Sequence, residues 1–347
     1  MREHKLIKII LYFLIFVFLL VGIWGIDTYK KAYTANVRLK DKFHHIYIPT
    51  GSTYEDVLAN LENENILINI QTFNWCAKRK NYIRHVYPGR YKIKNRMSNN
   101  QLIVMLRAGL QDPVKLTFNN IRFLEQLAKR ISRQIEADSA SLMNLFYDKE
   151  FIGEYGFDYY SVKGMFIPNT YEFWWNTDAR GFFIKMNKEY EKFWNYEREN
   201  RALDIGLTRH EASTLASIVG EETRKEDEKQ RIAGVYMNRL QKGIRLQADP
   251  TIKYAMGNFS VKRVLRNHLD NESPYNTYKN AGLPPGPIQI PSIKSIDAVL
   301  NYEKHDYLYF CAKDDFSGYH VFAKTLSQHN KNARLYQRAL SRRRIYK

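Results

Sequence analysis

The chain has 347 residues, which is more than one ordinary domain needs and enough for two or three. Its 44% hydrophobic and 14% aromatic residues can fill a core, which excludes a wholly disordered chain. The net charge of +18 favours an anionic partner such as nucleic acid, a membrane surface or an acidic polymer, but the charge is spread along the chain and selects none of them. Two cysteines, Cys76 and Cys311, are too few for a disulfide scaffold or a four-cysteine zinc site, and their apolar neighbours favour unpaired thiols over one long-range disulfide.

The first expected element is a helix that spans a membrane. Residues 9–26 carry no charge, and a hydrocarbon core of roughly 30 Å needs about twenty apolar residues, which the span reaches by borrowing two more across Lys8. A cleaved signal peptide is the alternative, but it would be shorter and end in a small-residue cleavage site, whereas polar and basic residues follow here. We therefore predict a short tail at 1–8 and a transmembrane helix at 9–26, and the flanking charges leave its orientation open.

Three stretches after the anchor repeat one pattern of a short strand, a polar turn and a capped helix. The strands are expected at 45–48, 91–93 and 114–118; the helices follow a capping box at 52–55, Ser98 as N-cap, and Asn119 or Asn120 leading 121–131. The pattern predicts a small α+β module at about 43–115 that leads into a larger α+β domain at 116–340. The module could be a plain spacer or a glycan-binding unit, because strand-helix units alone specify no ligand.

Aromatic residues become dense after residue 158. Most of them should fill a core, although some could stack on the apolar faces of sugar rings. Within this region, residues 164–171 have too much turn chemistry for a helix, so we expect this segment to end a strand in a loop.

Several kinds of site are missing from the sequence. It has no Walker-type phosphate loop, no dinucleotide glycine fingerprint and no His-Glu-x-x-His. The spacing of His305, His320 and His329 matches no standard metal pattern, so we expect neither a metal nor an organic cofactor. Nucleic acid is not an expected partner either, since the chain has no clustered basic recognition motif.

One glutamate stands out because of its place on a predicted helix. Thr208 to Glu211 form a capping box, and the helix that starts there has an apolar stripe. Glu222 lies seven residues after Leu215 and four after Ile218, so helical spacing places it on the buried face, whereas Glu221 is turned about 100° away.

A carboxyl group at the end of an apolar stripe should have a raised pKa, because burial disfavours its charged form and the helix C-terminus acts in the same direction. A carboxylic acid that stays protonated near neutral pH is what a general acid for glycosidic cleavage needs. The alternative is a helix that bends after Gly220 and exposes Glu222 as part of a charged run.

The segments after this glutamate supply hydrogen-bonding and aromatic groups. A second helix is expected at 226–242, and Asp249 or Thr251 can cap a short helix that ends near Gly257. Residues 275–278 alternate aromatic and hydrogen-bonding side chains, and the Gly-Leu-Pro-Pro-Gly-Pro run at 282–287 should form an ordered loop. Amide and aromatic groups around a protonated carboxyl suit a neutral polyhydroxylated ligand better than a phosphate.

Five motifs together resemble one enzyme family, the membrane-anchored endolytic murein transglycosylases. They are GMFIPNTYEF at 164–173, LASIVGEET at 215–223, VYMNRLQKGIRLQADPTIKYAMG at 235–257, YNTYKNAGLPPGPI at 275–288 and HVFAKTLSQHN at 320–330. With the anchor and a LysM-like module before them, the resemblance runs over nearly the whole chain. It implies a single-pass inner-membrane lyase with a cytoplasmic tail and a catalytic domain that faces the periplasm or cell exterior, where it cuts nascent peptidoglycan strands and limits their length.

The resemblance also implies roles for particular residues. The family's catalytic acid is the second glutamate of a Glu-x-Glu-Thr motif, which falls on Glu222; this chain departs from the pattern with Gly220 at the first glutamate and Asn169 in place of an aspartate. Glu222 would protonate the oxygen between N-acetylmuramic acid and N-acetylglucosamine and then accept the C6 hydroxyl proton as a 1,6-anhydro ring closes. Six further residues are expected to orient the sugar and the acid: Asn238, Gln247, Asp249, Tyr275, Asn276 and Tyr278.

Two other functions remain open at this point. A hydrolytic muramidase would need water and usually a second carboxylate, for which Asp249 is the nearby candidate, although its place before Pro250 also fits a helix cap. A catalytically silent glycan-binding scaffold for wall synthesis fits the LysM-like module and the basic surface. The expected partners are therefore peptidoglycan strands, the bilayer and the cell-wall synthases.

Overall fold

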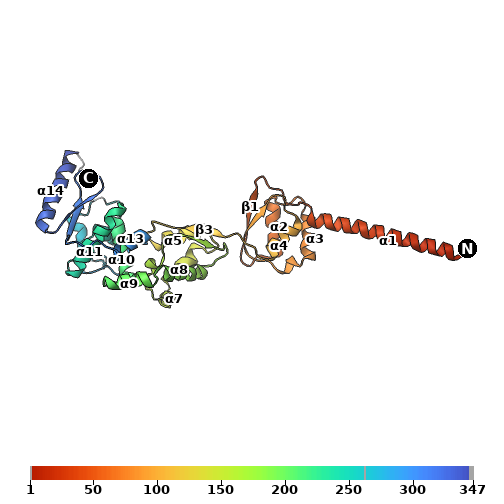
Figure 1. The fold of residues 1–347 in the computed structure, drawn as a ribbon, viewed down its shortest axis with the longest axis horizontal. Coiled ribbons are helices and arrows are strands. Elements are labelled where there is room, and N and C mark those ends of the chain that lie inside the picture. Colours follow the sequence, from red (N-terminus) through yellow and green to blue (C-terminus); the bar gives the residue numbers. More distant parts are fainter. Residues whose placement is uncertain (1, 262, 344–347) are drawn as a thin grey trace. The chain divides into compact units, whose positions relative to one another are not determined.

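The structure, a computed structural model, describes residues 2–261 and 263–343, so Met1 of the expected tail lies outside the described residues. The chain is mixed α+β and divides into two compact units (Figure 1). The smaller unit consists of Met1–Lys115, Gln134–Glu136 and Glu172–Thr177, and the larger unit consists of Leu116–Arg133, Ala137–Tyr171 and Asp178–Lys347.

Helix α1 (Arg2–Tyr33) is the apolar helix expected at the N-terminus, and it extends beyond the predicted 9–26 at both ends. Within its segment Lys5–Tyr33, a window of 18 residues has a mean hydropathy of 2.9 and is not buried against the protein, so by length and composition this helix fits a single-pass membrane anchor. The last turn belongs to the smaller unit, because Ala32 is buried in its core and the Lys31 carbonyl accepts a 2.8 Å hydrogen bond from Asn99.

The smaller unit runs strand, helix, helix, strand, helix. Its elements are β1 (Phe43–Ile48), α2 (Tyr54–Asn63), α3 (Ile70–Arg79), the 3-10 turn η1 (Tyr82–Arg84), β2 (Gly89–Lys94) and α4 (Asn99–Arg107). β1 and β2 are antiparallel, with Phe43 opposite Lys94 and Ile48 opposite Gly89. Alternate residues of both strands, such as Ile46 and Ile93, are fully buried against the helices, as expected of a sheet with one covered face.

The structure corrects several local predictions in this unit. Thr53, not Ser52, caps α2, and its capping-box partner is Asp56. Ser98 caps α4 as predicted. Helix α3 was not predicted, and it starts at the cap Asn69. Cys76 of this helix and Cys311 of the larger unit are both free thiols.

The unit also takes in residues before 43. Val37 is 1% exposed, and Asn36 hydrogen-bonds the Asn99 side chain at 2.7 Å and the Asn69 carbonyl at 2.8 Å. The stretch between α1 and β1 is therefore part of the folded unit and not a loose linker.

The first half of the larger unit is mainly helical. β3 (Val114–Thr117) and β4 (Thr170–Phe173) form a two-stranded sheet whose residues are divided between the two units. The helices are α5 (Leu124–Ile131), α6 (Ser139–Tyr147), α7 (Lys149–Gly153), α8 (Ala179–Phe193) and α9 (Tyr196–Asp204). The helix predicted at 121–131 begins only at Leu124, after a loop. Residues 164–171 start in the 3-10 turn η2 (Val162–Met165) and run into β4, so they precede a strand and do not end one as predicted.

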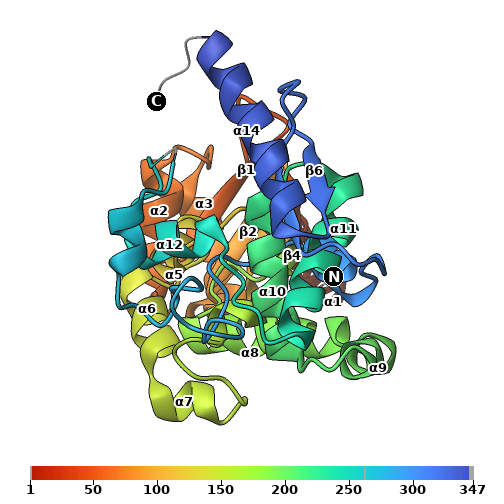
Figure 2. The same cartoon turned by 90° about the vertical axis from the view of Figure 1, so that its left-hand side faces the viewer.

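The second half is built around α10 (Arg209–Glu222), which packs against α11 (Lys229–Gln241), α12 (Asp249–Ala255) and α13 (Ile293–Leu300). The 3-10 turn η3 (Glu226–Glu228) precedes α11, and η4 (Arg266–Asp270) lies between α12 and α13. β5 (Tyr309–Ala312) and β6 (His320–Ala323) form an antiparallel hairpin, and α14 (Leu326–Arg342) packs along it (Figure 2). α10 is buried all round from Ala212 to Val219, which makes it the centre of the core.

Candidate active site

Glu222 is the last residue of α10, and the helix holds it in place. Thr208 and Glu211 form the predicted capping box, and the helix continues through Gly220 without the bend that would have exposed Glu222. The predicted apolar stripe is real, because Leu215, Ile218 and Val219 are fully buried.

Among the described residues, the Glu222 carboxyl has one hydrogen-bond partner, the hydroxyl of Tyr236 on α11, which donates a short hydrogen bond to Oε1. Desolvation by burial raises the pKa of Glu222 from 4.5 to about 7; the Tyr236 hydrogen bond opposes this rise, and the charge of Asp249 adds to it. Oε2 has no hydrogen-bond partner among the described residues. Near neutral pH the carboxyl can therefore hold a proton and present an oxygen to a ligand.

This carboxyl lies in the wall of a cavity of about 470 Å³, which we call the acid cavity. Its walls come from α10, α11, the start of α12, the 275–280 loop, the β5–β6 hairpin and α14. Its residues are Glu222, Tyr236, Arg239, Leu246, Gln247, Asp249, Tyr278, Leu308, Tyr309, Phe310, Cys311, Ala312, His320, Leu326 and His329. Hydroxyl, amide, guanidinium and imidazole groups thus surround the acid.

Asp249 does not cap α12, contrary to one of the two interpretations of the sequence. Ala248 is the N-cap residue, and its N–H donates to the Thr277 hydroxyl at 3.0 Å. The Asp249 side chain instead accepts a 2.6 Å hydrogen bond from the hydroxyl of Tyr278 and lines the acid cavity. A second carboxylate therefore faces the same space as Glu222.

Gln247 also lines the acid cavity, and Arg239 holds its side chain. The Arg239 guanidinium is buried and donates to the Gln247 amide oxygen at 3.1 Å and to the carbonyls of Arg245 and Leu308 at 2.9 and 2.6 Å. Gln247 has a left-handed backbone with φ of +50°, which an L residue other than glycine adopts only when its surroundings impose it. Arg239 is a site residue that the sequence analysis did not single out.

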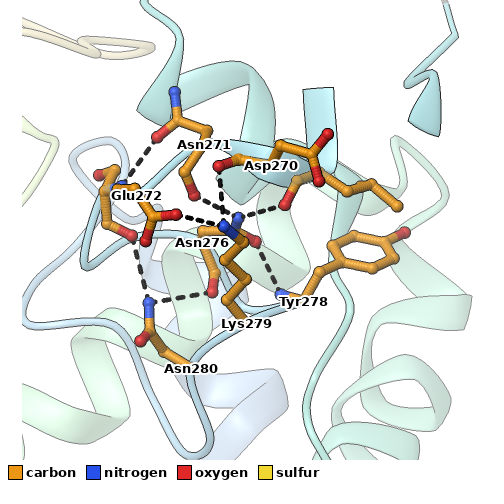
Figure 3. Close-up of polar contacts among 9 residues, drawn as sticks. Asp270, Asn271, Glu272, Asn276, Tyr278, Lys279 and Asn280 are labelled. Carbon is orange, nitrogen blue, oxygen red and sulfur yellow. Dashed lines mark hydrogen bonds and ion pairs between the residues drawn. The ribbon is translucent and has the colours of Figure 1, made fainter. Parts of the chain in front are cut away.

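Asn276 has a supporting position in the loop that carries Tyr278. It is fully buried, its amide donates to the carbonyls of Leu269 and Asn271 at 2.9 and 2.6 Å, and its oxygen accepts from the Tyr278 N–H at 3.0 Å (Figure 3). Asn276 thus folds the loop and does not face the acid cavity.

The structure places Asn238 and Tyr275 outside the acid cavity. The Asn238 amide donates to the carbonyls of His305 and Tyr307 at 2.6 and 2.9 Å, which fixes the chain that leads to β5. The Tyr275 ring packs on Tyr254, with ring centroids 4.6 Å apart, in a second cavity. Of the seven predicted site residues, Glu222, Gln247, Asp249 and Tyr278 share one cavity.

The sequence analysis missed the wall formed by the β5–β6 hairpin and α14. His320 lines the cavity, and its Nδ1 and backbone N–H bond the buried carboxylate of Glu228 at 2.9 and 2.8 Å. The Nδ1 atom of His329 is buried without a hydrogen-bond partner. Both histidines belong to the His320–Asn330 motif, which could have identified them.

The two departures from the family motif lie away from the acid. A side chain at Gly220 would meet Ser295 Oγ at 3.0 Å and Gln289 Nε2 at 3.3 Å, so this position faces α13. Asn169 accepts a 2.8 Å hydrogen bond from the Thr170 N–H through its side-chain oxygen, which an aspartate could accept equally well.

In the part of the chain that the structure describes, no group of three or more histidine, cysteine, aspartate or glutamate side chains could hold a metal. A protonated carboxyl beside a cavity rich in hydroxyl and amide groups defines the class of the site: general acid-base chemistry on a neutral, polar ligand.

Residues 46–335 match the YceG-like family, so the chain belongs to that family. It is 30% identical over 308 residues to the endolytic murein transglycosylase of Bacillus subtilis strain 168, with 83% of each chain covered. It is 28% identical to the enzyme of the same name from Streptococcus pneumoniae D39, of which it spans 58% while 84% of this chain is covered. A crystal structure of a yceG-like protein from Listeria monocytogenes superposes with a TM-score of 0.56 at 30% identity, covering 84% of this chain and 98% of that one.

Proposed function

We propose that this protein is an endolytic murein transglycosylase, a lyase that cuts within peptidoglycan strands and ends their elongation. The observation that carries the proposal is the Glu222 carboxyl, desolvated at the end of α10 and open to a cavity with room for sugar rings. Family membership and the names of the relatives from Bacillus and Streptococcus support the same activity.

The proposed reaction uses one carboxyl group twice. Protonated Glu222 gives its proton to the oxygen that links N-acetylmuramic acid to N-acetylglucosamine as that bond breaks. The resulting carboxylate takes the proton of the C6 hydroxyl, and this oxygen attacks the anomeric carbon to close a 1,6-anhydro ring. The nucleophile is part of the substrate, so it has a high effective concentration and no water is consumed.

The neighbours of Glu222 fit this double role. The Tyr236 hydroxyl holds Oε1, so that Oε2 is the oxygen available for the substrate. Gln247, Asp249 and Tyr278 offer hydrogen-bonding groups in the same cavity, and we assign them to orienting the sugar. Asn238, Asn276 and Arg239 are positioning residues, because they hold the segments that carry these groups.

Hydrolysis is the second candidate, and one observation favours it. Asp249 is free of the capping role and shares the cavity with Glu222, as the second carboxylate of a hydrolase would. However, Asp249 is held by a 2.6 Å hydrogen bond from Tyr278, and its charge raises the pKa of Glu222. Both observations favour a supporting role for Asp249 over that of a second catalytic carboxylate. The lone-acid mechanism therefore remains our proposal.

Mass spectrometry of the products decides between the two reactions. Purified peptidoglycan is digested in ¹⁸O-labelled water, and we expect ends of 1,6-anhydro-N-acetylmuramic acid without label. Reducing ends that carry ¹⁸O would show hydrolysis and contradict the proposal. A protein that binds strands but leaves them uncut would be a scaffold.

We propose further that α1 anchors the protein in the inner (plasma) membrane, with the tail before it in the cytoplasm and both units outside, where peptidoglycan lies. This location would also bring the protein next to cell-wall synthases and their nascent strands. A chain that starts at Asp27 keeps the core residues Asn36 and Val37, which a start at Asp41 would remove. It should leave the membrane fraction and still cut isolated strands; an inactive but folded protein would show that the anchor contributes to activity.

The smaller unit is proposed to be a LysM-like glycan-binding module. Its own core and its antiparallel β1–β2 pair support an independent binding unit. Sedimentation with insoluble peptidoglycan tests this role by comparing the Glu222→Gln chain with the same chain from which the smaller unit is deleted. If the deletion does not weaken binding, the smaller unit is a spacer.

A further inference from the structure

A second cavity of about 380 Å³ lies in the larger unit, and the proposed reaction at Glu222 does not use it. We call it the tyrosine cavity, because six aromatic rings line it: Phe123, Tyr147, Tyr159, Tyr160, Tyr254 and Tyr275. It shares two segments with the acid cavity. α12 gives Asp249 to one and Tyr254 to the other, and the 275–278 segment gives Tyr278 to one and Tyr275 to the other.

The six rings contact one another in sequence around the cavity. The centroid distances are 5.9 Å for Phe123–Tyr254, 4.6 Å for Tyr254–Tyr275, 6.3 Å for Tyr275–Tyr160, 5.3 Å for Tyr160–Tyr159 and 5.4 Å for Tyr159–Tyr147. The Tyr147 hydroxyl donates a 2.8 Å hydrogen bond to Glu125. This bond links the last ring of the series back to the segment that carries the first ring, Phe123. Rings fixed by their neighbours lose little freedom when a ligand packs on them.

Three of the six rings, which we call the rim tyrosines, are exposed to solvent. Tyr159 is 54% exposed, Tyr160 is 40% exposed and Tyr147 is 37% exposed, whereas Tyr275 below them is 8% exposed. Aromatic faces exposed together around a cavity offer a surface that an apolar ligand face would cover, and pyranose rings have such faces on their C–H sides.

The polar groups of the cavity suit a ligand that is neutral and carries an amide. The buried Lys163 side chain donates to the Tyr254 hydroxyl at 2.7 Å and to the Pro287 carbonyl at 3.1 Å. Its ammonium form has three N–H groups, so that form keeps one N–H for a ligand. Burial lowers the pKa of Lys163 to about 7, so the ammonium and the neutral amine, which has only two N–H groups, are both populated near neutral pH. Glu125 complements Lys163: its carboxylate can only accept hydrogen bonds, so it can accept one from a ligand hydroxyl.

The 282–287 loop packs against a residue that lines the tyrosine cavity. A side chain on Gly286 would lie 2.1 Å from the Tyr160 carbonyl, so the 282–287 loop presses its backbone directly on the rim. The same loop supplies the Pro287 carbonyl to Lys163, and the Ile288 N–H after it donates to Ser217 of α10 at 3.0 Å. The loop thus ties the tyrosine cavity to the helix that carries Glu222.

The two cavities lie on different sides of α12. Asp249 and Tyr254 are five residues apart on this helix, which separates them by about 7.5 Å along its axis and by about 140° around it. A strand with its scissile bond at Glu222 would therefore have to pass around α12 to place a more distant sugar in the tyrosine cavity.

We propose that the tyrosine cavity is a distal subsite that binds an N-acetylhexosamine ring of the strand that Glu222 cuts. The ring stacks on the rim tyrosines, its N-acetyl carbonyl accepts from Lys163, and a hydroxyl donates to Glu125. The inference rests on the proposed function and adds to it a preference for substrates long enough to fill both cavities.

The test measures binding apart from cleavage, with the full chain in detergent and Glu222→Gln as background. Calorimetry compares a peptide-free disaccharide with longer peptide-free glycan fragments. Tyr159→Ala should weaken binding of the long fragments about tenfold and leave disaccharide binding unchanged, since the loss of one stacked ring at about 1.4 kcal/mol corresponds to a tenfold change in affinity. Tyr159→Phe keeps the ring and should bind normally, and so should Tyr196→Ala, a control tyrosine on α9 that is 82% exposed.

The outcomes separate this inference from the proposed function. Unchanged binding of long fragments by Tyr159→Ala, or competition by free stem peptide that depends on Tyr159, overturns the subsite. If Tyr159→Ala loses long-fragment binding but the unmutated chain cuts no strand, the subsite stands and the proposed activity fails. Cleavage of strands together with a length dependence that Tyr159→Ala removes supports both.

Discussion

The acid cavity and the tyrosine cavity each contain an ionisable group whose pKa desolvation brings to about 7, and the two pKa values arrive there from opposite sides. The pKa of Glu222 rises from 4.5 and that of Lys163 falls from 10.5, with desolvation as the largest cause in each. Their partners differ. Glu222 has one hydroxyl partner and a neighbouring carboxylate, whereas two N–H groups of Lys163 are already committed to a hydroxyl and a backbone carbonyl. Desolvation thus sets the pKa of both groups, but only Glu222 has an oxygen free to exchange a proton with a ligand, because two N–H groups of Lys163 are held by the protein.

The largest effect that would test this contrast is expected at Glu222. Glu222→Gln keeps the shape and removes the exchangeable proton, so the rate of strand cutting should fall by about 10²–10⁴, the usual contribution of a general acid. Retention of more than about a tenth of the activity would contradict the assignment. Glu221→Gln is the matched control, because Glu221 pairs with Arg122 at 2.7 Å and should stay within about tenfold of the unmutated rate.

The same Glu222→Gln variant should also change stability with pH. The folded protein binds the Glu222 proton more tightly than the unfolded chain, so the unmutated protein loses stability as pH rises from 4.5 through 7. The variant escapes this loss, and at pH 8 it should be about 1–3 kcal/mol more stable than the unmutated protein, with little difference at pH 5. Urea unfolding at the two pH values measures this; an equal difference at both would show that Glu222 is not desolvated.

Lys163 should show the opposite pH dependence in stability and little effect on chemistry. Its folded pKa is the lower one, so the unfolded chain binds more protons above pH 7 and the unmutated protein gains stability as pH rises from 7 towards 10.5. Lys163→Met has no such titration. Relative to this variant, the unmutated protein should gain about 2–3 kcal/mol between pH 7 and pH 9 in urea unfolding. A pH-independent difference between the two proteins would place the amine in solvent.

The contrast between local and long-range causes also explains what the sequence could predict. α10, its apolar stripe and the place of Glu222 at its end follow from a capping box and helical spacing, which are both local, and the helix and its stripe were predicted correctly. The expected cap at Asp249 failed because the helix already starts at Asp249, and Tyr278, far along the chain, donates to the aspartate side chain at 2.6 Å. The Tyr236 partner and the His320 wall were missed for the same reason, since no local pattern pairs residues on different elements.

Two substitutions around Glu222 should move its pKa in opposite directions. Asp249→Asn removes a negative neighbour, so the pKa of Glu222 falls and the alkaline limb of kcat/KM moves to lower pH. Tyr236→Phe removes the hydrogen bond that favours the charged form, so the limb moves to higher pH. Both variants should retain measurable cutting, within roughly tenfold of the unmutated protein near pH 6. Movement in the same direction would mean that the cavity, and not these two contacts, sets the pKa.

The smallest effect is expected at Gly220, where the family motif has a glutamate. Gly220 lies two residues before Glu222, about 200° around the helix, and faces Ser295 and Gln289 of the neighbouring core. Both neighbours can donate a hydrogen bond to a new carboxylate, which would then be held on the side of α10 away from the acid cavity. Gly220→Glu should therefore leave the alkaline limb in place, and the helix propensity gained, about 0.5 kcal/mol, should offset part of the crowding against Ser295 Oγ at 3.0 Å. Gly220→Ala has the same crowding without the charge, so comparing the two pH profiles isolates the carboxylate. If Gly220→Glu moves the limb upward and Gly220→Ala does not, a glutamate at this position acts on the acid through the helix, and the loss of that glutamate in this chain has changed its working pH.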